Sequence, residues 1–412
     1  MWVLLAVNAS DAAGAAERTL YADAAAAGAA GQDGSAEHPF DTIQKAVNAA
    51  ASGDTAIVRD GTYNGIGNRG IDFAGKAIVL RSENGPYQCI IDCQKQGLAF
   101  AFHTAESAAA AVRGFTITNG LHVDGGAISC VSASPTISGN LILGNEALIQ
   151  AGAIYLDHAS PIIANNVIAH NTAGVWGGGI VAYNGSNPTV SNNTIADNAA
   201  SEIGGGMTCI TSSTVTVANC IIWGNTAAIG AQLAVGNDQL PSTLTVGYSD
   251  VSGGSAAVRV EKNCTLTWGD GNIADEPLFA DAAASDYHLE SRDGRWAPAA
   301  SAWVKDAAGS PCIDAGDPTA PFSGEPDPHG YRLNMGAFGN TPEASKSIRW
   351  PILGDANGDC SVNVLDLYAI RNRLNQDPAT ADNWIADVNR DGSINVLDLL
   401  LVRNNLLTKC TP

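Results

Sequence analysis

Two stretches near the end of the chain place oxygen-bearing side chains at the spacing of a calcium-binding loop. They are DANGDCSVNVLD at 355–366 and DVNRDGSINVLD at 387–398, and each carries Asp, Asn or Ser at loop positions 1, 3, 5, 7, 9 and 12. Calcium is a hard cation that takes about six to eight oxygen ligands, so we expect one ion in each loop. The predicted ligands are Asp355, Asn357, Asp359, Ser361, Asn363 and Asp366 in the first loop, and Asp387, Asn389, Asp391, Ser393, Asn395 and Asp398 in the second.

Each loop runs directly into an apolar helical pattern, VLDLYAIRNRL after the first and VLDLLLVRNNL after the second, and no helical pattern leads into either loop. Position 12 is Asp in both loops instead of the Glu of ordinary EF-hands. This repeat of loop and helix over residues 354–410 resembles a type I dockerin. The resemblance implies a small calcium-folded module that attaches a secreted enzyme to a cohesin-type protein on a scaffold or cell surface.

The two halves of this module are nearly superposable, which suggests a pseudo-twofold face that binds the partner. The predicted partner-binding residues are Val364, Leu365 and Arg371 in the first half and Val396, Leu397 and Arg403 in the second. Many dockerins carry small or hydroxyl residues at loop positions 10 and 11, whereas both loops have Val-Leu here. The alternative is that these aliphatic side chains fill the core between the two helices.

Composition restricts the compartment and the partners. The 412 residues include 21 Lys and Arg against 41 Asp and Glu, which gives a net charge of -20. This acidity argues against nucleic acid and anionic membranes as partners. Nine cysteines point to an oxidising, extracellular compartment, with Cys360 and Cys410 as a candidate disulfide pair. The apolar start MWVLLAV is short and lacks a basic region, so residues 1–18 are either a truncated signal peptide or leader or the product of a wrongly assigned start.

A repeat of 26 or 27 residues occupies the middle of the chain and predicts its fold. Short runs of alternating apolar residues are separated by Gly, Asn, Ser and Pro turns, and no long helix is expected between residues 114 and 258. This pattern predicts an all-β, right-handed parallel β-helix. Equivalent residues should stack along its axis, namely Gly126, Gly152, Gly178 and Gly205, an internal column of Ile142, Ile168, Ile195 and Ile222, and a ladder of Asn119, Asn145, Asn171, Asn198 and Asn225.

Both ends of the repeat carry further signals. Asp41 as N-cap and Gln44 at N3 predict a helix that covers the open apolar end of the stack. The DGTY that follows at 60–63 resembles the start of secreted proteins of the pectate-lyase-like superfamily, and EPLFADAAASDYHLESRDGRW and SPCIDAGDP resemble their closing coils. The resemblance implies their scaffold and no catalytic residues. We expect the β-helix at 19–340, a linker at 341–353, and the all-α dockerin at 354–412.

The repeat contains no Lys or Arg from Gly114 to Val258. Polyuronate lyases on this fold use Lys or Arg as base, so the gap argues against a lyase site on the central rungs. The clustered Asp motifs and Gly-His-Gly of polygalacturonases are also missing from the sequence. Paired carboxylates are therefore the better catalytic candidates.

Strand alternation points a set of aromatic and polar side chains outward on consecutive rungs. The predicted catalytic pair is Asp157 and Glu202, and the predicted substrate-binding residues are Tyr155, Trp176, Tyr183, Asp124 and Gln150. Aromatic faces stack on sugars, and carboxylates and amides bind their hydroxyl groups. His170 and Asp197 also stack on neighbouring rungs, where a charge-stabilised turn accounts for them as well as catalysis does.

Two functions from different classes follow from these features. The first is a secreted polysaccharide-degrading enzyme, a glycoside hydrolase delivered to a complex by its dockerin. The second is a non-catalytic carbohydrate-binding or adhesin-like β-helix on the same anchor. Polysaccharide and a cohesin-type protein are the expected partners, and calcium is the expected cofactor.

Overall fold

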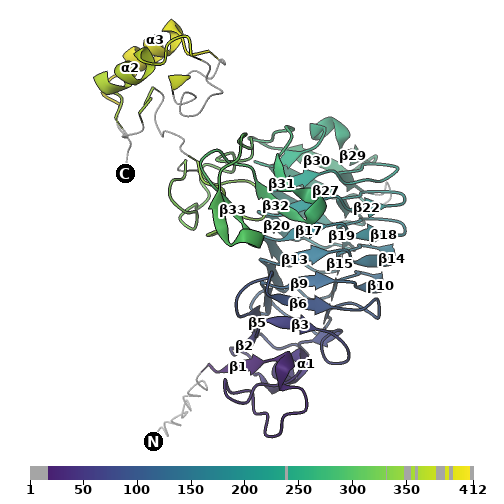
Figure 1. Ribbon diagram of the computed structural model, residues 1–412. Coiled ribbons are helices and arrows are strands. Elements are labelled where there is room, and N and C mark those ends of the chain that lie inside the picture. The colour runs from purple at the N-terminus through teal and green to yellow at the C-terminus, as the bar shows by residue number, and fades with distance from the viewer. Residues whose placement is uncertain are drawn as a thin grey trace, which may run out of the picture.

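The computed structural model describes residues 17–236, 240–330, 332–347, 354–357, 361–376, 386–388 and 393–408. The chain climbs in successive turns from the N-terminal helix to the last parallel strand, and equivalent strands of successive turns pair in parallel (Figure 1). The solenoid has four parallel sheets, which we call A, B, C and D and define below. A complete turn passes through a strand of sheet A, then sheet B, in some turns sheet D, and then sheet C. This confirms the predicted parallel β-helix.

Four parallel sheets make up this solenoid. Sheet A contains β1 (Thr19–Ala22), β2 (Thr55–Val58), β5 (Val79–Ser82), β8 (Ala111–Arg113), β12 (Thr136–Ser138), β16 (Ile162–Ala164), β20 (Thr189–Ser191), β24 (Thr214–Ala218), β27 (Thr243–Gly247) and β30 (Thr265–Trp268). Sheet B contains β3 (Gly61–Tyr63), β6 (Cys89–Asp92), β9 (Thr116–Thr118), β13 (Leu141–Leu143), β17 (Val167–Ala169), β21 (Thr194–Ala196), β25 (Ile221–Trp223) and β28 (Asp250–Val251). Sheet C contains β4 (Ile71–Asp72), β7 (Phe100–Phe102), β11 (Ile128–Val131), β15 (Ile154–Asp157), β19 (Ile180–Tyr183), β23 (Met207–Cys209), β26 (Leu233–Val235) and β29 (Arg259–Val260). The short sheet D contains β10 (Leu121–Asp124), β14 (Glu146–Gln150), β18 (Thr172–Ala173) and β22 (Ala199–Ala200).

The core of the solenoid is a set of apolar columns along its axis. Ile142 pairs with Ile168, Ile168 with Ile195, and Ile195 with Ile222, and all four side chains are fully buried. The predicted isoleucine column is therefore confirmed. The glycine column is also confirmed, because a Cβ atom on Gly126, Gly152 or Gly178 would meet the carbonyl oxygen of the next glycine in the column.

The asparagine ladder is present with one member wrongly assigned. The backbone N–H of Asn145 donates to Oδ1 of Asn171, that of Asn171 to Asn198, and that of Asn198 to Asn225, each at 3.0 Å. Asn119 was predicted as the first member but is not one, because Oδ1 of Asn145 accepts from the N–H of Gly120. The turn between β9 and β13 is one residue shorter than the next one, since Thr116 pairs with Leu141 and Leu141 with Val167.

A second asparagine ladder, which was not predicted from the sequence, runs along the turns between sheets A and B. The N–H of Asn140 donates to Oδ1 of Asn166, and that of Asn166 to Asn193, each at 3.0 Å. Cys220 follows Asn193 in the column and accepts through Sγ at 3.4 Å. The amide side chains satisfy backbone groups that a tight turn leaves without a partner inside the solenoid.

Helix α1 (Ile43–Ala49) covers the N-terminal end of the stack, as predicted (Figure 1). Its buried face consists of Ile43, Ala46 and Val47. The predicted cap was wrong, because Thr42 is the N-cap and Asp41 instead pairs with Lys45 at 2.6 Å. Oδ1 of Asn68, from a neighbouring loop, accepts the N–H of Ile43 at 3.0 Å and so satisfies the first turn of the helix.

The predicted closing coils do not continue the stack. After β30, the strands β31 (Phe279–Asp281) with β32 (Asp286–Leu289), and β33 (Arg295–Ala297) with β34 (Ala302–Val304), form antiparallel hairpins. We call the described residues from 278 to 347 the C-terminal cover. Its Tyr287 and Ala337 pack on Val167 and Ala196, which sheet B points outward. The cover therefore buries an apolar outer face of sheet B.

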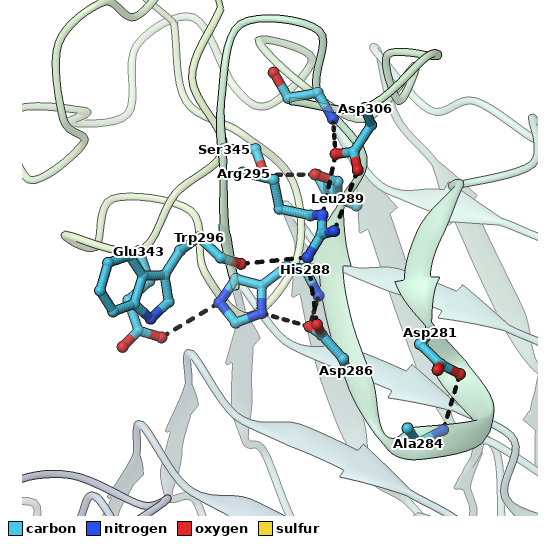
Figure 2. Close-up of polar contacts among 11 residues, drawn as sticks. Asp281, Ala284, Asp286, His288, Leu289, Arg295, Trp296, Asp306, Glu343 and Ser345 are labelled. Atoms are coloured by element: carbon cyan, nitrogen blue, oxygen red, sulfur yellow. Dashed lines mark hydrogen bonds and ion pairs between the residues drawn. The ribbon is translucent and has the colours of Figure 1, made fainter. Parts of the chain in front are cut away.

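Polar contacts fix the cover in place. The hydroxyl of Tyr287 donates to Oδ2 of Asp197 at 2.8 Å and lies 3.1 Å from Nε2 of His170. The predicted His170 and Asp197 pair therefore binds the cover. Figure 2 shows His288 between Asp286 and Glu343, with ring nitrogens at 2.7 and 3.3 Å from their carboxylate oxygens.

The described part of the C-terminal module contains the helices α2 (Val364–Arg371) and α3 (Val396–Asn404). Its described core is formed by Ala356, Val362, Ile370, Ala386, Ile394 and Val402. The Val-Leu pairs of the loops lie outside this core, since Val364 is 62% and Leu365 56% exposed. These pairs do not fill the space between the helices, which leaves them accessible to a partner.

None of the helices in the described part of the chain is long and apolar enough to cross a membrane.

Candidate functional site

Sheets D and C meet at a corner that brings most of the predicted strip together. Asp124 pairs with Gln150 in sheet D, and a bridge pairs Gln150 with Trp176. Gly125, Ala151 and Gly177 follow at the turn with positive φ and turn the chain towards sheet C. The three polar or aromatic side chains therefore form a column with one residue per rung.

The outward-facing residues of sheet C supply the rest of the predicted strip. Ile154 and Leu156 belong to the solenoid core, so Tyr155 and Asp157 project from the opposite face, and Asp157 pairs with Tyr183 on the next strand. The rings of Tyr155 and Tyr183 lie 6.4 Å apart. We call the six residues Asp124, Gln150, Trp176, Tyr155, Asp157 and Tyr183 the corner strip.

The tyrosines of the corner strip differ in accessibility. Tyr155 is only 7% exposed, because Ala151, Val181 and Tyr183 pack around it. Its predicted role as an open stacking surface is therefore wrong, and it forms the floor of the corner. Trp176 and Tyr183 are half-buried and retain accessible surface.

The sheet D column carries polar atoms that the protein leaves without a partner. Oδ1 of Asp124, Oε1 of Gln150 and Nε1 of Trp176 are each buried and make no hydrogen bond within the described residues. A buried polar atom without a partner costs about 1 to 3 kcal/mol. Three such atoms on consecutive rungs make this column a candidate ligand site.

Asp124 and Asp157 experience different environments. Burial raises the pKa of Asp124, and the negative charge of Asp157 contributes to the same shift. Asp157 is 22% exposed in its side chain and contacts Nδ1 of His158 at 2.6 Å. Burial also raises the pKa of Tyr155, with both carboxylates contributing, so this phenol stays protonated at neutral pH.

Glu202, the second predicted catalytic residue, lies outside the strip. The bridge from Trp176 leads to Ile203, and the N–H of Glu202 donates to the carbonyl of Val175. Glu202 is therefore one residue out of register with the column, and it is exposed. The spacing from Trp176 to Glu202 equals that from Gln150 to Trp176, but the longer turn before Ile203 shifts the register.

A pocket adjoins the outer end of the strip at His158. It has a volume of about 460 Å³ and is lined by His158, Asn184, Gly185, Thr211, Ser212 and Leu240. His158 contacts Asp157 and so joins the pocket to the strip. No sequence signal pointed to this pocket, because its lining comes from the turns that follow four consecutive strands of sheet C, β15, β19, β23 and β26.

The described parts of the calcium loops fit the predicted metal. Asp355 and Asp366 are buried, and Oδ1 of Asp366 accepts the N–H of Ala356 at 2.8 Å, which holds the two ends of the first loop together. Asp398 is fully buried at the equivalent place in the second loop. Buried carboxylates are stabilised by hydrogen bonds or by a metal ion, and Asp366 also accepts the backbone N–H groups of Asn357 and Asn363. The predicted ligands Asp359, Asn389 and Asp391, like Cys360 and Cys410, lie outside the described residues.

Asp366 and Asp398 also lie in the first turns of the helices. Asn363 and Asn395 are the N-caps of α2 and α3, and each forms a capping box with the Asp three residues later. The same carboxylates therefore couple loop closure to helix formation.

The two helices form a groove with internal symmetry. It has a volume of about 460 Å³ and is lined by the equivalent pairs Val364 and Val396, Leu367 and Leu399, Tyr368 and Leu400, and Arg371 and Arg403. Four of the six predicted partner-binding residues line it, while Leu365 and Leu397 are exposed beside it. Leu367, Leu399, Tyr368 and Leu400 were missed, because helical spacing alone did not separate a groove from a core.

Comparison with protein families gives two matches. The family described as right handed beta helix region matches residues 49–267, and the family described as dockerin type I domain matches residues 353–407. A search of curated protein sequences found no significant match.

Some solved structures are similar to this chain at low sequence identity and low TM-score. Pectate lyase Pel9A is 15% identical with a TM-score of 0.42, over 78% of this chain and 96% of that one. A mannuronic acid specific family 6 lyase from human gut microbiota is 15% identical with a TM-score of 0.34, over 62% of this chain and 55% of that one. Pectin methylesterase from carrot is 12% identical with a TM-score of 0.31, over 66% and 86% respectively.

Proposed function

Since the chain belongs to the right-handed β-helix family and ends in a dockerin, we propose that it acts outside the cell on polysaccharide. In this proposal the corner strip is the saccharide site. The C-terminal module anchors the chain to a cohesin-type protein, with Val364, Arg371, Val396 and Arg403 in the contact and one calcium ion in each loop.

The observation that carries the saccharide site is the column of unpartnered polar atoms. Asp124 and Gln150 offer acceptors for sugar hydroxyl groups, and the indole of Trp176 offers a donor beside an aromatic face. The repeat places them one rung apart, about 4.8 Å, which is close to the length of a sugar unit in an extended chain. A polysaccharide lying along the solenoid axis would meet one such group per unit.

We further propose that the strip hydrolyses the bound glycan, with Asp124 replacing Glu202 in the catalytic pair. The raised pKa of Asp124 suits a general acid, while Asp157, beside His158, suits a base. Asp124 would give its proton to the glycosidic oxygen as the bond from that oxygen to the anomeric carbon breaks. Asp157 would take a proton from the water whose oxygen bonds to that carbon.

The alternative is a non-catalytic carbohydrate-binding β-helix on the same anchor. The burial of Oδ1 of Asp124 favours it, because an acid must reach the glycosidic oxygen. Reducing-end release from polysaccharide separates the two. Release by the wild-type chain that Asp157→Asn abolishes supports hydrolysis, whereas binding without release supports the alternative.

Substitution of the half-buried indole of Trp176 tests the site itself. We expect Trp176→Ala to weaken polysaccharide binding by about tenfold or more, because stacking and a hydrogen-bond donor are both lost. Trp303→Ala is the matched control, since Trp303 is partly exposed on the C-terminal cover. Equal binding by both variants would remove the corner strip as the ligand site.

A further inference from the structure

The formal charges around the corner strip have one sign. Every residue among Lys, Arg, Asp and Glu from Gly114 to Val258 is an acid, and these residues build the rungs that form the strip. Two of the acids, Asp124 and Asp157, belong to the strip itself, one on each side of Tyr155.

Two basic side chains on or beside these sheets pair with carboxylates. Lys95 pairs with Glu146 at 3.2 Å, at the start of a sheet D strand. Arg259 lies on β29 of sheet C, four strands along from β15, and pairs with Glu261 at 2.7 Å. A ligand in the strip therefore meets acidic side chains, and both of these basic side chains have carboxylate partners of their own.

The pocket at the end of the strip is polar with little charge. Its lining offers the imidazole of His158, the amide of Asn184 and the hydroxyl groups of Thr211 and Ser212. Amides and hydroxyl groups both donate and accept, which matches the hydroxyl groups of a sugar. The volume of about 460 Å³ lies in the range of small-ligand pockets.

From this charge distribution we infer that the corner strip and its pocket bind a neutral polysaccharide and reject polyuronates. The inference rests on the proposed function and adds the class of substrate. A polyuronate carries a carboxylate on every sugar, and like charges near a protein surface repel one another. A neutral glycan presents only hydroxyl groups, which the half-buried polar and aromatic side chains of the strip and the lining of the pocket can bind.

The test measures binding of the full chain at neutral pH and constant calcium concentration to two sets of polymers. The neutral set contains xylan, galactan and glucomannan, and the acidic set contains polygalacturonate and alginate. We expect at least one neutral polymer to bind at least about tenfold more tightly than either acidic one, with little dependence on salt. Trp176→Ala should lose the binding, and Glu202→Gln should retain it, because Glu202 is exposed outside the column.

Each other outcome has a distinct meaning. Tight binding of a polyuronate that Trp176→Ala abolishes would overturn the neutral class while the saccharide site stands. Binding of any polymer that Trp176→Ala leaves unchanged would overturn the proposed site and, with it, the inference. Failure of every polymer to bind would also overturn both.

Discussion

Asp124 and Asp157 show how the solenoid gives two identical side chains different chemistry. Asp124 lies at the turn between two sheets, where burial raises its pKa, and Asp157 lies at the open end of a strand. General acid catalysis needs a carboxyl group that keeps its proton, and the raised pKa of Asp124 favours this role. The residue pattern alone suggested carboxylates but did not reveal which of them is buried.

The first prediction concerns this pair. We expect Asp124→Asn and Asp157→Asn each to lower any hydrolysis rate by about 100-fold or more, because each removes a proton-transfer group. Wild-type activity should fall as the pH rises through the raised pKa of Asp124, since the acid must be protonated. Reducing-end assays across pH check both points. Full activity in Asp124→Asn would exclude it as the acid, and Glu202→Gln serves as the control.

The second prediction concerns Asp250, a fully buried carboxyl that accepts from Sγ of Cys312 at 3.0 Å. Burial raises its pKa from 3.8 to about 7. The folded state therefore holds a proton that the unfolded state releases, and stability falls as the pH rises from 3.8 to about 7. Asp250→Asn should remove this loss and stabilise the protein at pH 8 by up to about 4 kcal/mol.

Thermal unfolding at pH 5 and pH 8 measures this effect. The wild-type chain should lose stability between these values, and Asp250→Asn should lose less. Glu276→Gln is the control, because Glu276 is exposed near the same carboxyl. An equal loss in the wild-type chain and Asp250→Asn would contradict the prediction.

At the scale of the elements, the ladders decide the register. The isoleucine column follows from an apolar residue recurring at one position of each repeat, which a single sequence shows directly. Asn119 and Glu202 were misplaced for the same physical reason, since a turn can lose or gain one residue while the strands stay paired. Equal sequence spacing therefore does not guarantee stacking, and only the backbone pairing assigns the rung position.

The third prediction tests the first asparagine ladder. Asn171 accepts from the backbone and side chain of Asn145 and donates to the carbonyl of Ile142 and to Asn198. Asn171→Ala leaves several buried groups without partners, so we expect a loss of at least about 2 kcal/mol in the free energy of unfolding. Denaturant titration measures it. Asn119→Ala, outside the ladder, should cost less, and an equal loss would contradict a special role for the ladder.

At the scale of the whole molecule, local pattern predicted the repeat, the calcium loops and the capping helix. It did not predict the C-terminal cover as a separate layer. The contacts of Tyr287 with Asp197 and of Ala337 with Thr194 join segments far apart in sequence. The corner strip was found in part, because alternation gives the outward side of a strand, whereas the burial of Tyr155 depends on three neighbouring side chains.

The fourth prediction is that the cover loosens as the pH rises. Burial alone would lower the pKa of His288, but hydrogen bonds to Asp286 and Glu343 raise it above its ordinary 6.5. This contribution to stability is therefore complete below pH 6.5 and is lost as the pH rises through the folded pKa. Two other groups near these carboxylates do not change charge in this pH range. Arg295, which is 3.4 Å from Asp286, stays positively charged. The hydroxyl of Tyr87 stays protonated, because burial raises its pKa.

Hydrogen exchange of residues 278–330 and 332–347 at several pH values checks the fourth prediction. Exchange of the wild-type cover, corrected for intrinsic rates, should increase at high pH. His288→Gln should exchange faster at low pH and show a smaller change, while His158→Gln, at an exposed histidine, should match the wild-type chain. Asp250 also makes the protein less stable as the pH rises. The contribution of His288 is therefore measured as the difference in exchange between His288→Gln and the wild-type chain at each pH. An identical pH response in His288→Gln would contradict the assignment.

The fifth prediction separates the two folding units by their need for metal. The solenoid core is an apolar stack, whereas the C-terminal module gathers buried carboxylates that repel one another without a cation. Chelation of calcium should therefore unfold α2 and α3 and leave the β-sheet signal of the solenoid unchanged. Circular dichroism of the full chain should lose helical signal in chelator and regain it on adding calcium.

The double variant Asp366→Ala with Asp398→Ala should show the low-helix state even in calcium, because each Asp serves both its loop and its helix cap. Asp275→Ala, an exposed acid outside the module, provides the control. Helical signal that persists in chelator would show that the module folds without the metal, and cohesin binding would then have to be independent of calcium.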